Sequence, residues 1–261
     1  MILVPDVRGL PHPGETANPG TMKLGISPCR SLMPLCRNRE WATHMPLPIF
    51  PLNAVLFPGL PLPLRIFEDR YLRMLADHAS VDPVFGIALI ESGREVGDEP
   101  EFHHIGTTAR LVSLNAQSAH RVDVVVVGER RIRMGPGDWK RGYAVSEVEF
   151  IADQSEESDE MGTLVATAGN AYQTYLRGVA HLIGMDYEPP DFGTDGASVS
   201  YEIGARLPLH TWEQQALLED SSPLSRMRTV VNLLEREVAL LYRSGMVGVP
   251  IQFPGNRFTL N

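Results

Sequence analysis

The chain has 261 residues, a formal net charge of −9 and 43% hydrophobic residues. This length allows one large or two small domains, and the apolar content is ordinary for a protein that buries a core. The acidic balance argues against a general binder of nucleic acid or of anionic membranes, because such proteins need a basic surface to displace counterions. No apolar run approaches the roughly 18 residues that a membrane-spanning helix needs, so we expect no membrane partner.

Residues 1–44 are rich in Pro, Gly and Arg and show no periodic apolar pattern. They lack the sustained apolar segment of a secretory signal. Both cysteines of the chain, Cys29 and Cys36, lie here, and their spacing matches no common zinc site. We therefore expect a cytoplasmic protein in which residues 1–44 are either a disordered leader or a misassigned extension before a true start at Met45.

The most informative stretch is residues 47–75, because prolines interrupt its first half. Proline cannot donate to a sheet ladder, so these positions are restricted to edge strands, turns and extended chain. The Phe-Pro-Gly sequence at residues 57–59 predicts a turn. Glu68 and Asp69 then place negative charge where the first turn of a helix favours it, and apolar residues follow at helical spacing. The prolines are Pro48, Pro51, Pro58, Pro61 and Pro63.

Residues 85–151 predict several short strands separated by turn signals, which is the pattern of an antiparallel barrel. The strongest strand candidate contains four consecutive valines and then alternates. Gly128 within it predicts a bulge or a bend. We assign the β-rich part of the chain to residues 46–151. The expected strands are residues 85–90, 105–114, 121–134 and 143–151.

The next part, residues 158–245, is predicted to be helical, and residues 246–261 to be a C-terminal tail. The spacing of Thr211 and Gln214 is that of a capping box, which predicts a helix start. The last helix is predicted to have Ser222 as its N-cap, Pro223 at its first position and Gly245 beyond its end. Before them we expect a long helix at residues 161–183, a loop at 187–197 and a short helix at 199–207.

Three motifs near the start of the β-rich part form one long, ordered and proline-fixed pattern. They are Leu47-Pro48-Ile49-Phe50-Pro51-Leu52, Leu56-Phe57-Pro58-Gly59, and Ile66-Phe67-Glu68 with Arg70-Tyr71. This pattern resembles the start of the N-terminal substrate-binding domain of Lon proteases. Residues 201–241 resemble the helical end of that family, so the resemblance spans roughly Met45 to Leu241. It implies an α+β fold, in which a PUA-like antiparallel β-barrel is followed by a C-terminal helical bundle.

The resemblance also implies a function. It suggests a stand-alone bacterial member of the family that lacks the ATPase and protease modules. Such a protein would be a non-catalytic module that binds unfolded or misfolded polypeptides. It could serve as an adaptor or regulator for a separate ATP-dependent protease, which is then a candidate partner. The oligomeric state does not follow from the resemblance.

The residues themselves indicate no catalytic chemistry. The lysines of the chain are Lys23 and Lys140, and neither follows a glycine, so a phosphate-binding Gly-Lys-Ser/Thr loop is absent. His103 and His104 are adjacent, and neighbouring side chains on a strand point to opposite faces and cannot easily share a metal. We therefore predict no catalytic residue, no metal site and no cofactor.

The candidate polypeptide-binding residues are Phe57, Leu60, Leu62 and Leu64, which could line an apolar groove for extended chains. The alternative is that this proline-rich segment covers a sheet edge.

A second candidate function is RNA binding by a PUA-like barrel, through the basic run at residues 130–133. The simpler interpretation is a solvated strand face, with Ile132 and Met134 buried behind Arg131 and Arg133. The acidic net charge and the lack of interleaved aromatic residues favour that interpretation.

Overall fold

The computed structural model describes most of the chain between Met45 and Arg243. The predicted leader, the predicted tail, Gly245 and both cysteines lie outside the described residues, so the expectations for them stay predictions. The described residues are 45–78, 84–118, 120–155, 158–184, 190 and 192–243.

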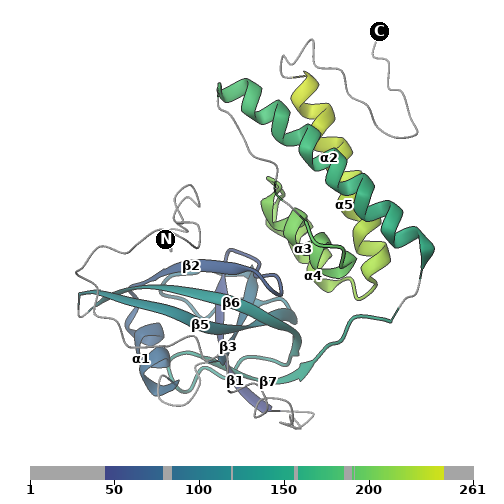
Figure 1. The fold of residues 1–261 in the computed structure, drawn as a ribbon. Coiled ribbons are helices and arrows are strands. Elements are labelled where there is room, and N and C mark those ends of the chain that lie inside the picture. The colour runs from purple at the N-terminus through teal and green to yellow at the C-terminus, as the bar shows by residue number, and fades with distance from the viewer. Residues whose placement is uncertain are drawn as a thin grey trace, which may run out of the picture.

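The described residues form a strand-rich part and then a helical part (Figure 1). The first contains β1 (Met45–Leu52), β2 (Pro61–Ile66), α1 (Asp69–His78), β3 (Val84–Ser92), β4 (Glu101–Phe102), β5 (Ile105–Ser118), β6 (Arg121–Met134) and β7 (Ala144–Phe150). The second contains α2 (Asp159–Ile183), α3 (Gly196–Arg206), α4 (Thr211–Glu219) and α5 (Pro223–Arg243).

The strand pairings form a closed cycle. β1 pairs with β7, β7 with β6, β6 with β5, β5 with β3, and β3 returns to β1. All of these pairings are antiparallel, as predicted, except that between β1 and β3, which is parallel. β2 pairs with β6 alongside residues 122–127, before β7 takes over at residues 132–134. A barrel requires such a cycle, and the barrel itself stays a prediction.

The prolines of β2 lie at positions where the missing N–H removes no hydrogen bond to β6. β2 pairs with β6 alone among the described strands. The Gly128 N–H donates to the Leu60 carbonyl oxygen at 3.0 Å, so by alternation the even-numbered residues of β2 bond to β6. Pro61 and Pro63 therefore face the open edge of the sheet. The turn before β2 also forms as predicted, with Gly59 at a φ of 79°.

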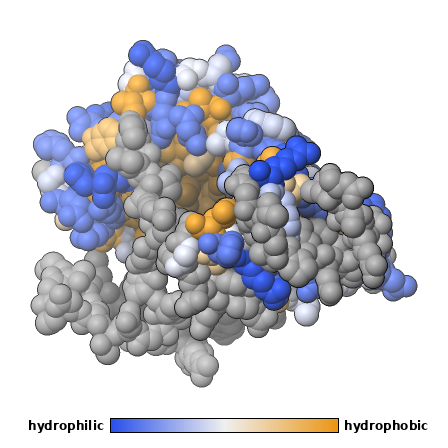
Figure 2. Space-filling model, turned by 90° about the horizontal axis from the view of Figure 1, so that it is seen from above, coloured by the Kyte–Doolittle hydropathy of each residue, from blue (hydrophilic) through white to orange (hydrophobic). Residues whose placement is uncertain are grey.

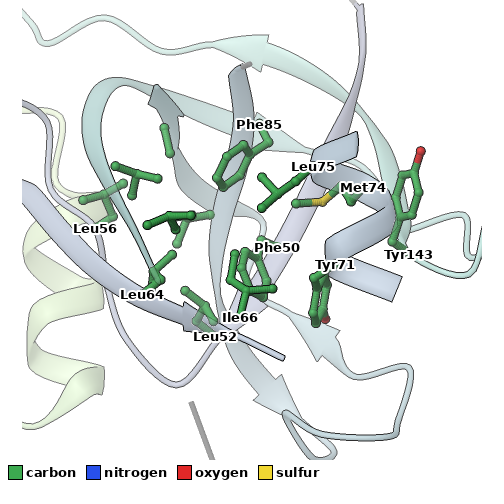
Figure 3. Close-up of a cluster of buried hydrophobic side chains, with 14 residues drawn as sticks. Phe50, Leu52, Leu56, Leu64, Ile66, Tyr71, Met74, Leu75, Phe85 and Tyr143 are labelled. Carbon is green, nitrogen blue, oxygen red and sulfur yellow. The ribbon is translucent and has the colours of Figure 1, made fainter. Parts of the chain in front are cut away.

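One apolar core lies between helix α1 and the sheet (Figure 3). Tyr71, Met74 and Leu75 form the buried face of α1, and Phe50 of β1 and Phe85 of β3 meet them. The rings of Phe50 and Tyr71 are 4.0 Å apart, centroid to centroid. Burying one such side chain contributes roughly 1.5–3 kcal/mol, so these contacts fix α1 against the strands.

A second core lies within the helical part, where α2 and α5 run side by side (Figure 1). Met227, Val230 and Leu234 of α5 are fully buried in it. Ser222 caps α5 as predicted, because its Oγ accepts a hydrogen bond from the Ser225 N–H at 3.0 Å. The description of the helices as a bundle stays a prediction.

The cap of α4 differs from the prediction by one residue. Thr211 is the first residue of the helix, and His210 is its N-cap. The side chain that reaches back is Glu213, whose Oε2 accepts the His210 N–H at 2.9 Å. The Thr211–Gln214 spacing therefore predicted the position of the helix correctly but not the residues of its capping box. The pairs His210–Glu213 and Thr211–Gln214 have the same spacing and overlap in the sequence.

Candidate functional site

A buried arginine of β6 joins the sheet to the helical part. Only 3% of the Arg131 side chain is exposed. Its guanidinium donates hydrogen bonds to the carbonyl oxygens of Leu218 (3.0 Å), Asp220 (3.2 Å) and Ala152 (3.2 Å). The prediction of a solvated face for Arg131 is therefore wrong. Alternation correctly opposed Arg131 to the buried Ile132, but the end of α4 covers the face on which Arg131 lies.

A second buried arginine, Arg226 of α5, meets the same carboxylate. Asp153, in the linker that follows β7, accepts from Arg131 at 2.6 Å and from Arg226 at 2.8 Å. Arg226 also donates to Ser200 Oγ at 2.8 Å, and its guanidinium carbon lies 4.0 Å from the centroid of the Tyr201 ring. Removing one partner of a buried ion pair typically costs 3–5 kcal/mol, so this junction holds the two parts of the chain together.

The loop between β1 and β2 inserts into the helical core. The ring of Phe57 stacks on that of Tyr201 with centroids 5.2 Å apart. Burial raises the pKa of Tyr201 to about 12, because the charged form of the phenol is disfavoured inside the core. The loop also requires Gly128, because a Cβ there would lie 2.3 Å from the Phe57 carbonyl oxygen. Gly128 therefore allows a close backbone approach, a second role for glycine in a strand.

The four predicted binding residues do not form one exposed surface. Phe57 and Leu64 are each only 2% exposed. Leu60 and Leu62 are partly exposed, but Leu60 packs against the helical core and Leu62 against the core beneath α1. A direct contact of Phe57 or Leu64 with a polypeptide would require the side chain to leave its core. Their binding role stays a prediction.

The neighbouring residues of the same strands form an apolar surface that faces outward. Val124 and Val126 of β6 point into the core, so Val125 and Val127 point away from it. Both are partly exposed, and Pro63 and Pro61 of β2 lie directly opposite them. Val112, at an irregularity of β5, is 40% exposed. We call Pro61, Pro63, Val112, Val125 and Val127 the outer face.

Ion pairs lie at both ends of the outer face. Arg65 Nε donates to Asp123 Oδ1 at 2.8 Å, and Arg110 Nε donates to Glu129 Oε1 at 2.6 Å. The hydrogen bond from Arg65 holds the pKa of the Asp123 carboxyl below its usual range. Because each charge has a partner, the rim carries little net charge. Seen from above, the molecule shows apolar surface in a hollow with hydrophilic surroundings (Figure 2).

The predicted basic run does not form a common basic surface. Arg131 is buried, Arg133 donates to Glu149 at 3.1 Å, and the guanidinium of Arg130 lies over the ring of Phe150. RNA binding by this run is therefore not favoured, because Arg131 is buried, Arg133 is paired with a carboxylate, and a single remaining arginine makes no basic surface.

The described residues also offer no obvious catalytic or metal centre. They contain no group of three or more His, Cys, Asp or Glu side chains that could hold a metal. His103 Nδ1 lies 3.4 Å from Glu219 Oε1, and Lys140 pairs with Asp138 at an exposed turn. In the described part of the chain, no helix has the length and apolarity to cross a membrane.

Sequence reasoning missed the outer face although its signal was present. Four consecutive valines in an alternating strand place two side chains on each face. The prediction took the run only as the sign of a strong strand and did not assign the valines to the two faces of the sheet. Arg226 gave no signal, because nothing in a helical pattern distinguishes a buried arginine from an exposed one.

Comparison with known proteins identifies the family that the sequence matches. The family model of the ATP-dependent protease La (LON) substrate-binding domain matches residues 46–236. The Lon protease of Buchnera aphidicola is 24% identical over 208 residues, which are 78% of this chain and 26% of that protein. Lon protease 2 of Myxococcus xanthus is 27% identical over 206 residues, which are 77% of this chain and 25% of that protein. The chain thus spans about a quarter of the length of these relatives.

Solved structures agree with the family model. A crystal structure of a Lon N-terminal domain protein from Xanthomonas campestris is 26% identical, with a TM-score of 0.55, and covers 72% of this chain and 98% of that one. The N-terminal domain of the Mycobacterium avium complex Lon protease is similar in fold, with 22% identity, a TM-score of 0.56, and coverage of 73% and 98%. Since the family model covers most of the chain and the fold agrees, the chain belongs to the family of Lon substrate-binding domains.

Proposed function

We propose that this chain is a non-catalytic module that binds unfolded or misfolded polypeptides, and that the outer face takes up their apolar segments. The observation that carries the proposal is the partly exposed position of Val125 and Val127 on the outward side of the sheet. Valines at such positions belong to no core, so they stabilise the fold little and are available to a partner. The family match supports a polypeptide as that partner.

The open edge of β2 limits how a polypeptide can bind. Strand addition requires N–H donors and carbonyl acceptors in alternation along the edge. Pro61 and Pro63 remove two successive donors, so an added strand would make only part of its ladder. Binding would then depend on side-chain contacts with the outer face. Such contacts tolerate many sequences, which suits a protein that recognises exposed apolar segments rather than one motif.

The expected affinity is modest. A patch of a few hundred Å² contributes about 25 cal/mol per Å² of apolar surface. Most of that gain offsets the cost of ordering a flexible chain. We expect dissociation constants on the order of micromolar or weaker.

The wider role follows from the same proposal. The module would deliver or hold substrates in the cytoplasm, as an adaptor or regulator for an ATP-dependent protease. The strand cycle would be a PUA-like barrel within residues 46–151, and the helices a bundle within residues 158–245. The family model that matches is that of a substrate-binding domain, which supports a binding role.

The test measures binding of a permanently unfolded, labelled polypeptide to the full chain. The double substitution Val125→Lys and Val127→Lys should weaken binding about tenfold, because it places two charges in the apolar contact. Val125→Thr with Val127→Thr keeps the strand shape and should weaken binding less. The matched control is Leu182→Lys, on an exposed position of α2. Equal affinity of the control and the double lysine variant would rule out the outer face, and failure of the unaltered chain to bind any unfolded polypeptide would rule out the function.

A further inference from the structure

A separate cavity of about 220 Å³ opens beside the first residues of β1. Its apolar lining comes from Met45, Leu47, Val84 and Phe150, and Pro46 and Pro48 complete that wall. Thr108, Glu129, Arg130 and His78 contribute the polar atoms. The cavity lies where β1 is not yet paired with β3, because that pairing begins at Ile49.

Among the described residues, no strand pairs with the edge of β1 beside the cavity. Opposite Pro48, the backbone N–H and carbonyl of Val145 both bond to Asp138, at 2.9 and 2.8 Å. Opposite Pro46, the Glu147 carbonyl accepts the Gly135 N–H at 3.0 Å. These prolines therefore do not bond to β7, and the Pro46 carbonyl oxygen faces this edge. It can accept a hydrogen bond from the backbone of an occupant, while proline offers no donor in return.

One cation at the cavity lacks an acidic partner. The guanidinium carbon of Arg130 lies 3.9 Å from the centroid of the Phe150 ring, which holds the planar group and leaves its N–H edges free to donate. Within the described part of the chain, no carboxylate oxygen lies within ion-pair distance of Arg130. The nearby Glu129 is already bonded to Arg110. The mouth of the cavity therefore carries a net positive charge beside an apolar wall.

We propose that this cavity binds the C-terminal residue of a polypeptide. The apolar wall would take the last side chain, Arg130 would bind the terminal carboxylate, and the Pro46 carbonyl would accept a backbone N–H of the occupant. A carboxylate matches a guanidinium in shape and charge, and a chain end is the place where a carboxylate adjoins both an apolar side chain and a backbone N–H. This inference rests on the proposed function, because it names a second contact that a bound polypeptide would make.

The experiment uses the full chain and a short, labelled, otherwise polar peptide that ends in a free-carboxylate leucine. Its partner probe is the same peptide with an amidated C-terminus. Fluorescence anisotropy should show that amidation weakens binding about tenfold or more, because a charge-assisted hydrogen bond is lost. Arg130→Gln should remove this preference and bind both peptides weakly. The matched control is Arg133→Gln, which is exposed and paired with Glu149 outside the cavity, and it should keep the preference.

The possible results distinguish failure of the chain-end site from failure of the proposed function. Equal binding of the free and amidated peptides would overturn the chain-end site, and unaltered binding of unfolded protein in the same preparation would leave the proposed function standing. Competition by octanoate at the affinity of the free peptide would show that a small apolar carboxylate, rather than a chain end, is the ligand, and would also overturn it. A carboxylate preference that Arg130→Gln abolishes while octanoate competes poorly would support it.

Discussion

The ion pair between Glu213, at the start of α4, and Arg236 should make the stability of the protein depend on pH. Glu213 is 5% exposed, and Arg236 of α5 donates hydrogen bonds to its carboxylate. This contact is the largest cause that holds the pKa of the Glu213 carboxyl below its usual value. A lowered pKa in the folded state stabilises the protein above the unfolded pKa, and that stabilisation is lost as the pH falls through the folded value.

We therefore predict that Glu213→Gln lowers the free energy of unfolding at neutral pH by about 1 kcal/mol, since Arg236 is partly solvated and screening reduces the gain. The difference between variant and parent should shrink below about pH 4. Urea unfolding at both pH values measures it. Glu202→Gln, which breaks a more exposed pair with Arg206, is the control and should change little. A difference that stays constant with pH would mean that shape, not charge, stabilises this contact.

At the scale of single residues, Arg131 shows that the alternation of side chains along a strand does not reveal which other elements pack on each face. Alternation assigned Arg131 and Ile132 to opposite faces, and both are placed so. It could not show that α4 lies on the face of Arg131, because that contact joins residues 87 positions apart. The outcome was a buried arginine where a solvated one was expected. The prediction of one groove failed to foresee a similar long-range effect. Phe57 and Leu64 are close in sequence, but they are buried in two different cores.

At the scale of the elements, the strands and helices themselves were largely predictable from the sequence, but the pairing of the strands was not. Most strands and helices could be predicted, because period and turn residues act locally: β6 has its expected bounds, and α2 begins two residues before its expected start. The pairing partners could not, because they depend on contacts distant in sequence. The parallel pairing of β1 with β3 is the example. The role of proline at a strand edge was predictable, since proline lacks the donor wherever it lies.

We predict that Pro63→Val increases self-association of the chain. Valine restores an N–H on the open edge of β2 and favours a strand, so a second molecule could pair there. Light scattering against concentration should rise, while the midpoint of thermal unfolding at low concentration changes by only a few degrees. Pro63→Lys restores the same N–H but adds a charge that opposes edge pairing, and it should stay monodisperse. Equal association of both variants would remove the edge as the cause.

For the whole molecule, the relation between the sheet and the helices depends on Asp153. Two buried guanidinium groups share its carboxylate, and Phe57 inserts from the sheet side into the helical core. Neither feature could be predicted from the sequence, because each is defined by how two parts dock. These contacts predict that the two parts unfold together, since separation would leave charges and aromatic surface without partners.

We predict that Asp153→Ala divides this unfolding into two transitions. Without the carboxylate, Arg131 and Arg226 face each other in a buried site, a change that typically costs 3–5 kcal/mol. Two single-tryptophan versions can follow the parts. One retains Trp139, which packs against buried strand residues that include Ile132 and Met134, and the other retains Trp212 on α4. Their fluorescence midpoints in urea should coincide in the parent and separate in the variant. Coincident midpoints in the variant would show that the Phe57–Tyr201 contact and its neighbours couple the two parts without the ion pairs.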